Sequence, residues 1–162
     1  MIKSVSYYNS PIGSLEIVTY DFEVHGCRFL EDMNTGTFAA SPFGKVVIDQ
    51  LEEYFNGKRK SFQLTLGDVG TKFDDLVWDE VCRIKYGTTQ SYQQIAERIN
   101  APDSVRAVGA SNGRNPILII VPCHRVIATD GSLKGYAGQV WRKKWLLEHE
   151  AKIEWGVQTL FT

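Results

Sequence analysis

ILIIVPCHRVI, residues 117–127, contains an uninterrupted apolar run that ends in a thiol, an imidazole and a guanidinium. The run predicts a strand over 117–121 that is buried on both faces, followed by a turn that carries Cys123, His124 and Arg125. A cysteine is nucleophilic as the thiolate, and a nearby base or cation lowers the pKa of its thiol. A free cysteine is also a common small core residue, so the motif alone leaves catalysis and packing open.

The length and composition are those of an ordinary globular protein: 162 residues, a net charge of −1 and 43% hydrophobic residues. No apolar run reaches the roughly 20 residues of a membrane span, and the N-terminus lacks the order of a signal peptide. Three cysteines without paired spacing indicate a reducing compartment, so we expect a cytoplasmic protein, or a nuclear one in a eukaryote. His25 and Cys27 are close in sequence, but two ligands do not make a metal site.

The small net charge hides an asymmetry between two parts of the chain. Residues 1–82 hold 7 Lys/Arg and 13 Asp/Glu, whereas residues 83–150 hold 10 Lys/Arg and 5 Asp/Glu. A basic second half attracts a polyanion, so the pattern favours nucleic acid as a partner over a random surface imbalance.

The first part, residues 1–70, reads as a small antiparallel sheet with one helix and a linker. Runs rich in β-branched and aromatic residues over 5–8, 15–20 and 24–30 predict a meander, because turn residues separate them. We expect a loop over 31–41, a helix from Pro42 to Asn56-Gly57, and a short strand over 62–66.

The second part, residues 71–162, reads as mainly helical. Thr71 can cap a helix that runs to about Gly87, with a core face made of Phe73, Leu76, Val77, Val81 and Ile84. Helices over 92–99 and from Pro102 or Asp103 to about 111 predict a helix-turn-helix, whose second helix commonly docks on DNA. A pair of short helices with solvated charges is the plainer interpretation.

A glycine-rich loop over 129–138 and a final helix over 140–149 complete the chain. That helix has Trp141, Trp145 and Leu146 at positions that predict a core face.

Several motifs occur together in a specific order, densely between about Phe73 and Glu150. They are Tyr92-Gln93-Gln94-Ile95-Ala96, Arg106-Ala107-Val108-Gly109, Asn115-Pro116, Val121-Pro122-Cys123-His124-Arg125-Val126-Ile127, Gly135-Tyr136 and Leu146-Leu147-Glu148-His149-Glu150. With them the chain resembles the O6-alkylguanine-DNA alkyltransferase family, also called methylated-DNA–protein-cysteine methyltransferases. The resemblance implies an α+β protein in which a ribonuclease H-like sheet-and-helix domain precedes a helical domain with a helix-turn-helix.

The resemblance also implies the chemistry of the site. Cys123 would take the alkyl group irreversibly from O6-alkylguanine, or from O4-alkylthymine, in a single turnover. His124 would accept the thiol proton through a water, and Glu150 would orient the imidazole. Tyr92 would donate to the departing guanine, and Asn115 would tie the DNA-binding helices to the cysteine. By this reasoning the pKa of the Cys123 thiol should lie below its ordinary value of about 8.5.

The family's DNA contacts carry over to the second helix of the pair. Arg106 would enter the minor groove and replace the flipped base, while Ala107, Gly109 and Ala110 would let that helix approach the groove floor. Val126, Tyr136, Ala137 and Gly138 would line the base pocket.

No cofactor and no metal are implied. The expected partner is double-stranded DNA carrying O6-alkylguanine, bound in the minor groove by a monomer. Two alternatives remain: a damage sensor of the kind that lacks the cysteine, which the presence of Cys123 disfavours, and a transcription factor, which leaves Cys123 and His124 unexplained.

Overall fold

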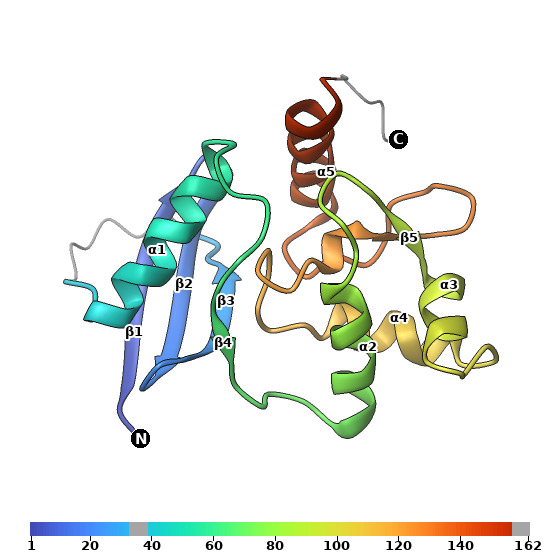
Figure 1. Cartoon of the computed structure of the whole chain (residues 1–162), viewed down its shortest axis with the longest axis horizontal. Helices are drawn as coiled ribbons and strands as arrows, with labels where there is room; N and C mark the ends of the chain where they lie inside the picture. The colour runs from blue at the N-terminus through green and yellow to red at the C-terminus, as the bar shows by residue number, and fades with distance from the viewer. Residues whose placement is uncertain (33–38, 157–162) are drawn as a thin grey trace. The chain divides into compact units, whose positions relative to one another are not determined.

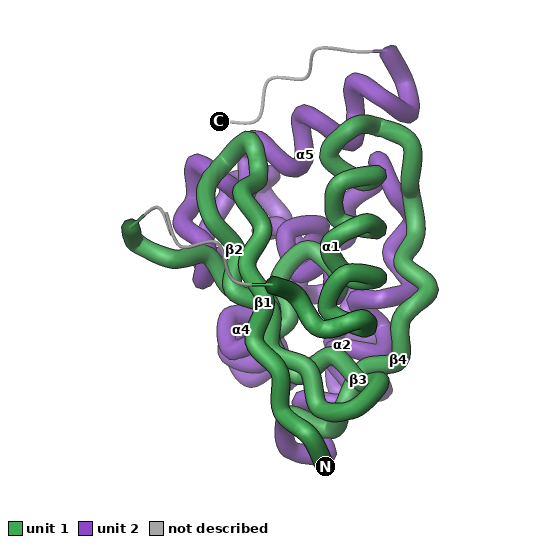
Figure 2. Tube along the Cα trace, turned by 90° about the vertical axis from the view of Figure 1, so that its left-hand side faces the viewer, with its two compact units in different colours: residues 1–69, 116–120 green, residues 70–115, 121–162 purple. Residues whose placement is uncertain are grey.

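The computed structural model describes residues 1–32 and 39–156, and the chain forms two compact units. Figure 2 shows them in different colours: the first is Met1–Val69 with Pro116–Ile120, and the second is Gly70–Asn115 with Val121–Thr162. A four-stranded sheet with one helix makes up most of the first unit, and helices dominate the second. The α+β class expected from the sequence is confirmed.

The first unit begins with the predicted meander (Figure 1). Strands β1 (Lys3–Ser10), β2 (Gly13–Tyr20) and β3 (Glu23–Phe29) pair in order and antiparallel. Alternate residues of β2, among them Leu15 and Ile17, are fully buried, as one covered face of a sheet requires.

Helix α1 (Pro42–Phe55) covers this sheet by packing on β1 and β2. It begins where the sequence predicts, because the Ser41 hydroxyl accepts a hydrogen bond from the Gly44 amide at 3.0 Å and Pro42 occupies the first turn. The strand expected over 62–66 shortens to β4 (Thr65–Leu66), which pairs parallel to β3. Part of the loop expected over 31–41, residues 33–38, lies outside the described residues.

In the second unit, helix α2 (Lys72–Cys82) begins with the capping box of Thr71 and Asp74. It ends before the predicted Gly87, and turns carry the chain onward. The prediction that Leu76 faces the core is wrong, since 55% of this residue is exposed. Trp78 lies on the buried face instead, and its indole nitrogen donates to the Ser111 carbonyl at 2.9 Å.

The helix-turn-helix is present as α3 (Tyr92–Arg98) and α4 (Val105–Gly113), which pack on each other and on α2. Ser91 caps α3 with a second capping box. Helix α4 begins later than Pro102, because a turn closed by the Ser104 amide on the Ala101 carbonyl precedes it.

The strand predicted over 117–121 is not formed, although all five residues are buried. Ile117 makes one parallel bridge to Cys27 in the first unit. Ile119 then adopts a left-handed φ of 72°, and the Ile120 amide donates to the Leu118 carbonyl at 2.8 Å. A tight turn therefore interrupts the apolar run, which the hydrophobic pattern could not reveal because burial is equally satisfied.

Residues Cys123, His124 and Arg125 follow as the 3₁₀ turn η1 (Cys123–Arg125), as the sequence predicts a turn there. Strand β6 (Val126–Ile127) then pairs parallel to β5 (Gln90–Ser91). This pairing matters because β5 leads directly into Tyr92, so Tyr92 is brought to the side of the Cys123 turn.

The last helix, α5 (Val140–Trp155), is longer than predicted, and of the three residues expected on its core face only Leu146 is buried. Trp141 is 51% exposed, so its assignment to the core is wrong, and Trp145 is half-buried. The buried face consists of Lys143, Leu146, Leu147, Glu150 and Ala151. Two charged residues thus occupy core positions of this helix.

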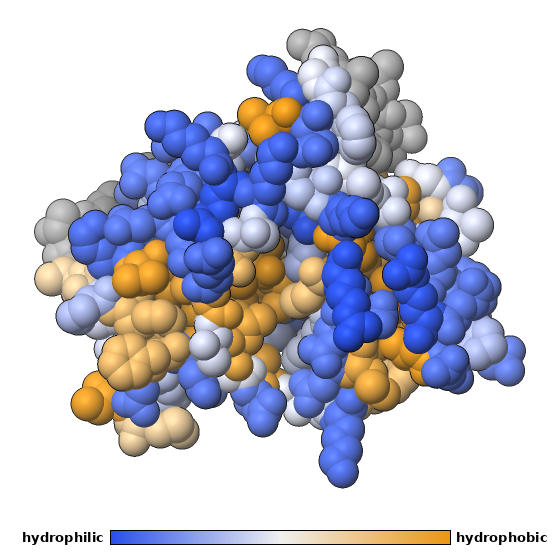
Figure 3. Space-filling view, viewed as in Figure 1, coloured by the Kyte–Doolittle hydropathy of each residue, from blue (hydrophilic) through white to orange (hydrophobic). Residues whose placement is uncertain are grey.

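Hydrophilic residues cover much of the face in Figure 3, with hydrophobic residues visible among them. None of the helices in residues 1–32 and 39–156 is long and apolar enough to cross a membrane.

Candidate active site

Cys123 is the first residue of η1 and is 2% exposed. Its amide donates to the Val121 carbonyl at 2.8 Å, across Pro122 with φ −82° and ψ 57°. These are the dihedral angles of an inverse γ-turn, and the proline ring fixes the required φ. The Pro-Cys pair therefore places the thiol on a tight, preset bend.

Asn115 connects the end of the helix-turn-helix to this bend. Its side-chain amide donates to the Val121 carbonyl at 3.0 Å and to the Cys123 sulfur at 3.2 Å. From α4, the Asn112 amide donates to the Cys123 carbonyl at 3.2 Å. A donor aimed at the sulfur favours the thiolate over the thiol.

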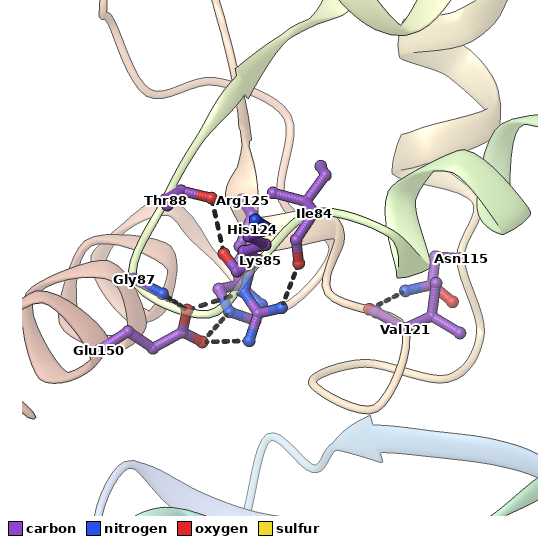
Figure 4. A network of polar contacts seen from close by, with 9 residues as sticks. All are labelled: Ile84, Lys85, Gly87, Thr88, Asn115, Val121, His124, Arg125 and Glu150. Carbon is purple, nitrogen blue, oxygen red and sulfur yellow. Dashed lines mark hydrogen bonds and ion pairs between the residues drawn. The ribbon is translucent and has the colours of Figure 1, made fainter. Parts of the chain in front are cut away.

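The Glu150 carboxylate contacts two side chains of η1, those of His124 and Arg125 (Figure 4). One carboxylate oxygen, Oε2, lies 2.6 Å from His124 Nε2 and 3.1 Å from Arg125 Nη2. The other, Oε1, accepts from Arg125 Nε at 2.7 Å and from the Gly87 amide at 3.3 Å. Arg125 also donates to the Ile84 carbonyl at 2.8 Å, so its guanidinium is held on two sides.

The protonation states follow from these contacts. Burial would raise the pKa of Glu150, but the charges and hydrogen bonds of His124 and Arg125 hold it well below its ordinary value. Burial lowers the pKa of His124, and Glu150 opposes this without overcoming it. An ionised carboxylate can only accept hydrogen bonds, so His124 Nε2 carries the imidazole hydrogen. His124 Nδ1 therefore has a free lone pair. Within the described chain, Nδ1 has no hydrogen-bond partner.

The expectation of a lowered thiol pKa is wrong for this structure. Burial raises the pKa of Cys123 to about 11, while the Asn115 hydrogen bond and the Lys143 charge oppose it. The sequence indicated a cation beside the thiol, but the neighbouring guanidinium of Arg125 is bound to Glu150. Burial, which a motif does not report, therefore outweighs the nearby charge.

Tyr92, the first residue of α3, also lies near the Cys123 turn. Its hydroxyl donates to the Lys134 carbonyl at 3.2 Å, and burial followed by the charge of Cys123 raises its pKa. Lys143 donates to the same carbonyl at 3.0 Å.

Sequence reasoning noted the Arg125 guanidinium beside the thiol but gave no role to Lys143, and both residues are buried. A signal for Lys143 was present: it stands seven residues before Glu150, which is two helical turns and hence the same helix face.

The residues expected to contact DNA lie on α4. Arg106, Ala107 and Ala110 are exposed, and their spacing places them on one side of the helix. Gly109 is half-buried, and a Cβ built there would meet the Tyr92 ring at 3.9 Å, an ordinary contact.

The residues expected to line a base pocket are mixed in exposure. Val126, Tyr136 and Gly138 are buried, whereas Ala137 is exposed. Tyr136 to Gln139 forms a turn in which the Gln139 amide donates to the Tyr136 carbonyl at 3.0 Å. Among the described residues, no group of three or more His, Cys, Asp or Glu side chains could hold a metal ion.

Comparisons with known proteins cover both units. A model of the 6-O-methylguanine DNA methyltransferase ribonuclease-like domain matches residues 4–67, and a model of the DNA-binding domain of the same family matches residues 72–152. A methylated-DNA–protein-cysteine methyltransferase from Mycobacterium bovis is 40% identical over 94% of this chain and 95% of its own length.

Solved structures agree with these matches. The Mycobacterium tuberculosis O6-methylguanine methyltransferase superposes with a TM-score of 0.86 at 40% identity, covering 99% of this chain and all of the other. The Mycobacterium tuberculosis OGT protein in complex with DNA gives a TM-score of 0.82 at 42% identity, covering 91% and 92% of the two chains.

Proposed function

The chain belongs to the 6-O-methylguanine DNA methyltransferase family, and we propose that Cys123 is the residue through which it repairs alkylated DNA by direct reversal. The observation that carries this role is the bend at Cys123: a buried thiol that accepts a hydrogen bond from Asn115, next to a His124–Glu150 pair. Neither a damage sensor nor a transcription factor needs that arrangement.

The transfer can be written with the residues at hand. The thiol proton passes to the Nδ1 lone pair of His124, carried by a water as the family resemblance implies, and Glu150 stabilises the resulting imidazolium. The sulfur then forms a bond to the alkyl carbon as the bond between that carbon and guanine O6 breaks. Tyr92 donates towards the guanine as negative charge develops on it. Tyr92 supplies the proton that guanine needs, and the proton held by His124 returns through water to restore the Tyr92 hydroxyl. The net change is that the alkyl group moves from guanine to sulfur and one proton moves from sulfur to guanine.

DNA binding is assigned to the helix-turn-helix. Similarity to a relative solved in complex with DNA supports DNA as the partner. On α4 the exposed Arg106 would enter the minor groove and occupy the place of the flipped base, and the small Ala107, Gly109 and Ala110 would permit close approach. The duplex would carry O6-alkylguanine, and one protein molecule would bind it as a monomer.

The loop before α5 would form the wall of the base pocket. The backbone of Val126 and of residues Tyr136, Ala137 and Gly138 would bind the edge of the base. Ala137 has no hydroxyl, so any hydrogen bond at that position would come from its backbone. The range of alkyl groups accepted depends on this wall.

Intact-mass measurement after incubation with a duplex containing O6-methylguanine tests the function. We expect a gain of one methyl per molecule, located on Cys123 by peptide mapping, and no further turnover, because a thioether has no good leaving group. Cys123→Ala should bind the duplex without transfer, and Cys82→Ala should transfer normally as the matched control. Binding without methylation of the unaltered protein would favour a damage sensor, and turnover beyond one equivalent would contradict the mechanism.

A further inference from the structure

The loop that precedes α5, residues 134–139, is anchored at its start beside Tyr92. The Lys134 carbonyl accepts a hydrogen bond from the Tyr92 hydroxyl at 3.2 Å. A Cβ built on Gly135 would lie 3.8 Å from the same hydroxyl oxygen. Burial and then the charge of Cys123 raise the pKa of Tyr92, so this tyrosine is near the thiol. The start of the loop therefore lies beside residues that the proposed transfer uses.

The end of the loop is bound to the first turn of α5. The Gln139 amide donates to the Tyr136 carbonyl at 3.0 Å, and the Gln139 carbonyl accepts from the Arg142 amide at 3.1 Å. The side-chain oxygen of Gln139 accepts from the Trp141 indole at 2.9 Å. The Arg142 guanidinium donates to the Gly138 carbonyl at 3.2 Å. Two side chains of the helix thus hold two consecutive residues of the loop.

Arg142 is not a solvated charge on the helix surface. It is half-buried and lies in the first turn of α5, where the helix dipole disfavours a cation. Its guanidinium carbon lies 4.6 Å from the centre of the Trp141 ring, which is a cation–π contact. Burial lowers the pKa of Arg142, and the charge of Tyr136 opposes this, so the guanidinium is also near a loop residue. The side chain therefore interacts with both the helix and the loop.

The residue held by these contacts has a strained backbone. Gln139 adopts φ 76° and ψ 146°, a region that residues other than glycine rarely enter. Such a conformation persists only where the surrounding contacts fix it. Trp141 fixes the side chain of Gln139, and Arg142 fixes the carbonyl of the preceding residue, Gly138. Without these two contacts, we expect the loop to leave this conformation.

We propose that Arg142, together with Trp141, is a positioning residue that fixes the loop over 134–139 and so limits the size of the alkyl group that the base pocket accepts. The proposal rests on the function proposed for Cys123 and on the assignment of residues 136–138 to the pocket wall. Arg142 takes no part in the chemical step, because no proton and no electron pair passes through it.

A wall that is fixed before the base enters discriminates between alkyl groups by size. A methyl group needs little room, whereas a benzyl group has to displace a wall that is close to the sulfur. Displacing the loop breaks the contacts of Arg142 and Trp141, so these contacts oppose the larger group and not the smaller one. Removing them should therefore favour benzyl transfer relative to methyl transfer.

A competition between two alkylated duplexes tests the proposal. The protein is mixed with an excess of two duplexes of one sequence, one carrying O6-methylguanine and the other O6-benzylguanine, and intact mass gives the ratio of benzyl to methyl on the protein. Each molecule reacts once, so the ratio does not depend on the fraction of a variant that folds. Arg142→Met should raise the ratio by about two- to tenfold, the range to which one lost hydrogen bond corresponds. An unchanged ratio would overturn the proposal.

Three further variants serve as controls. Trp141→Phe keeps the ring but removes the indole donor to Gln139, so it should raise the ratio in the same direction. Arg142→Lys keeps a cation that can donate to the Gly138 carbonyl and should return the ratio towards that of the unaltered protein. Lys144→Met removes an exposed cation of the same helix and should leave the ratio unchanged. An equal rise in Lys144→Met and Arg142→Met would show that helix charge, and not the loop contact, sets the selectivity.

Hydrogen exchange measures the loop itself without any substrate. The Gln139 amide, which is bonded to the Tyr136 carbonyl, should exchange about tenfold faster in Arg142→Met than in the unaltered protein. Equal exchange rates would overturn the proposal even if the ratio changed. If the unaltered protein takes up neither alkyl group, the proposed function fails and the pocket role fails with it. If the unaltered protein reacts and Arg142→Met gives the same ratio, only the role of Arg142 is rejected.

Discussion

His124 Nε2 lies 2.6 Å from Glu150 Oε2, with 0% and 1% of the two side chains exposed. Glu150 is a buried residue in the middle of α5 and does not lie at an exposed helix end. The structure therefore excludes the interpretation that Glu150 is a solvated charge. Because the same carboxylate also binds Arg125, it has two tasks: it sets the imidazole tautomer and it neutralises a buried guanidinium.

We expect Glu150→Gln to destabilise the protein as well as slow transfer. The substitution leaves Arg125 buried without an anion, and breaking a buried pair in this way costs about 3–5 kcal/mol. Urea unfolding measures the loss. Glu148→Gln, on the exposed side of the same helix, should change stability by less than about 1 kcal/mol. Equal effects of the two substitutions would show that the buried network does not stabilise the fold.

Asn115→Ala should slow alkylation of Cys123 at neutral pH by roughly tenfold, since the hydrogen bond to sulfur favours the thiolate and one pKa unit is a factor of ten. The pH–rate profile should shift towards higher pH. Asn112→Ala is the matched control, because its amide binds the Cys123 carbonyl and not the sulfur. We expect Asn112→Ala to reduce stability without moving the profile, and a shift of both profiles would contradict the assignment.

We expect the stability of the protein to fall at acidic pH because of the buried carboxyl of Asp74. Burial would raise the pKa of this carboxyl, but hydrogen bonds from Ser111 at 2.6 Å, from the Thr71 amide at 3.0 Å and from Arg114 at 2.7 Å hold it well below its ordinary value. A depressed pKa adds stability above the unfolded pKa of about 3.9, and that stability is lost as the pH falls below it.

Thermal unfolding between pH 7 and pH 3 therefore should show a steeper loss in the unaltered protein than in Asp74→Asn. Asp79→Asn, an exposed carboxylate of the same helix, should leave the curve unchanged. Parallel curves for the unaltered protein and Asp74→Asn would refute a contribution from this network.

Arg106→Ala should weaken repair of duplex DNA by about tenfold or more, about 1.4 kcal/mol, and leave dealkylation of free O6-benzylguanine nearly unchanged. The free base needs no flipping, so only the duplex reaction should depend on an exposed arginine of α4. Arg98→Ala, exposed at the end of α3, serves as the charge-matched control at the same salt concentration. Equal loss on both substrates would place Arg106 in the fold or the chemistry.

Gln139→Gly should stabilise the protein by about 1 kcal/mol. Gln139 precedes α5 with φ 76° and ψ 146°, a region in which side chains other than glycine are strained by roughly 1–3 kcal/mol. The greater freedom of unfolded glycine offsets part of the gain. The melting temperature measures the net change, and a decrease would show that the Gln139 side chain, which accepts from the Trp141 indole at 2.9 Å, outweighs the strain.

Local patterns determined much of the fold. The alternation of β1 to β3, the caps at Thr71 and Ser91, and the glycine after α1 depend on residues near one another in sequence, so periodicity and capping rules located them. The order of motifs around Cys123 also indicated the family without any coordinates.

Tertiary structure decided what local patterns could not. An apolar run satisfies burial as a turn or as a strand, so the left-handed Ile119 was invisible in the sequence. Helix spacing could place Lys143 and Glu150 on one face, but not reveal that this face is the core, because charged residues ordinarily lie outside. The thiol pKa depended on burial, on the hydrogen bond from Asn115 and on the charge of Lys143, since desolvation and hydrogen bonding are properties of packing and not of composition.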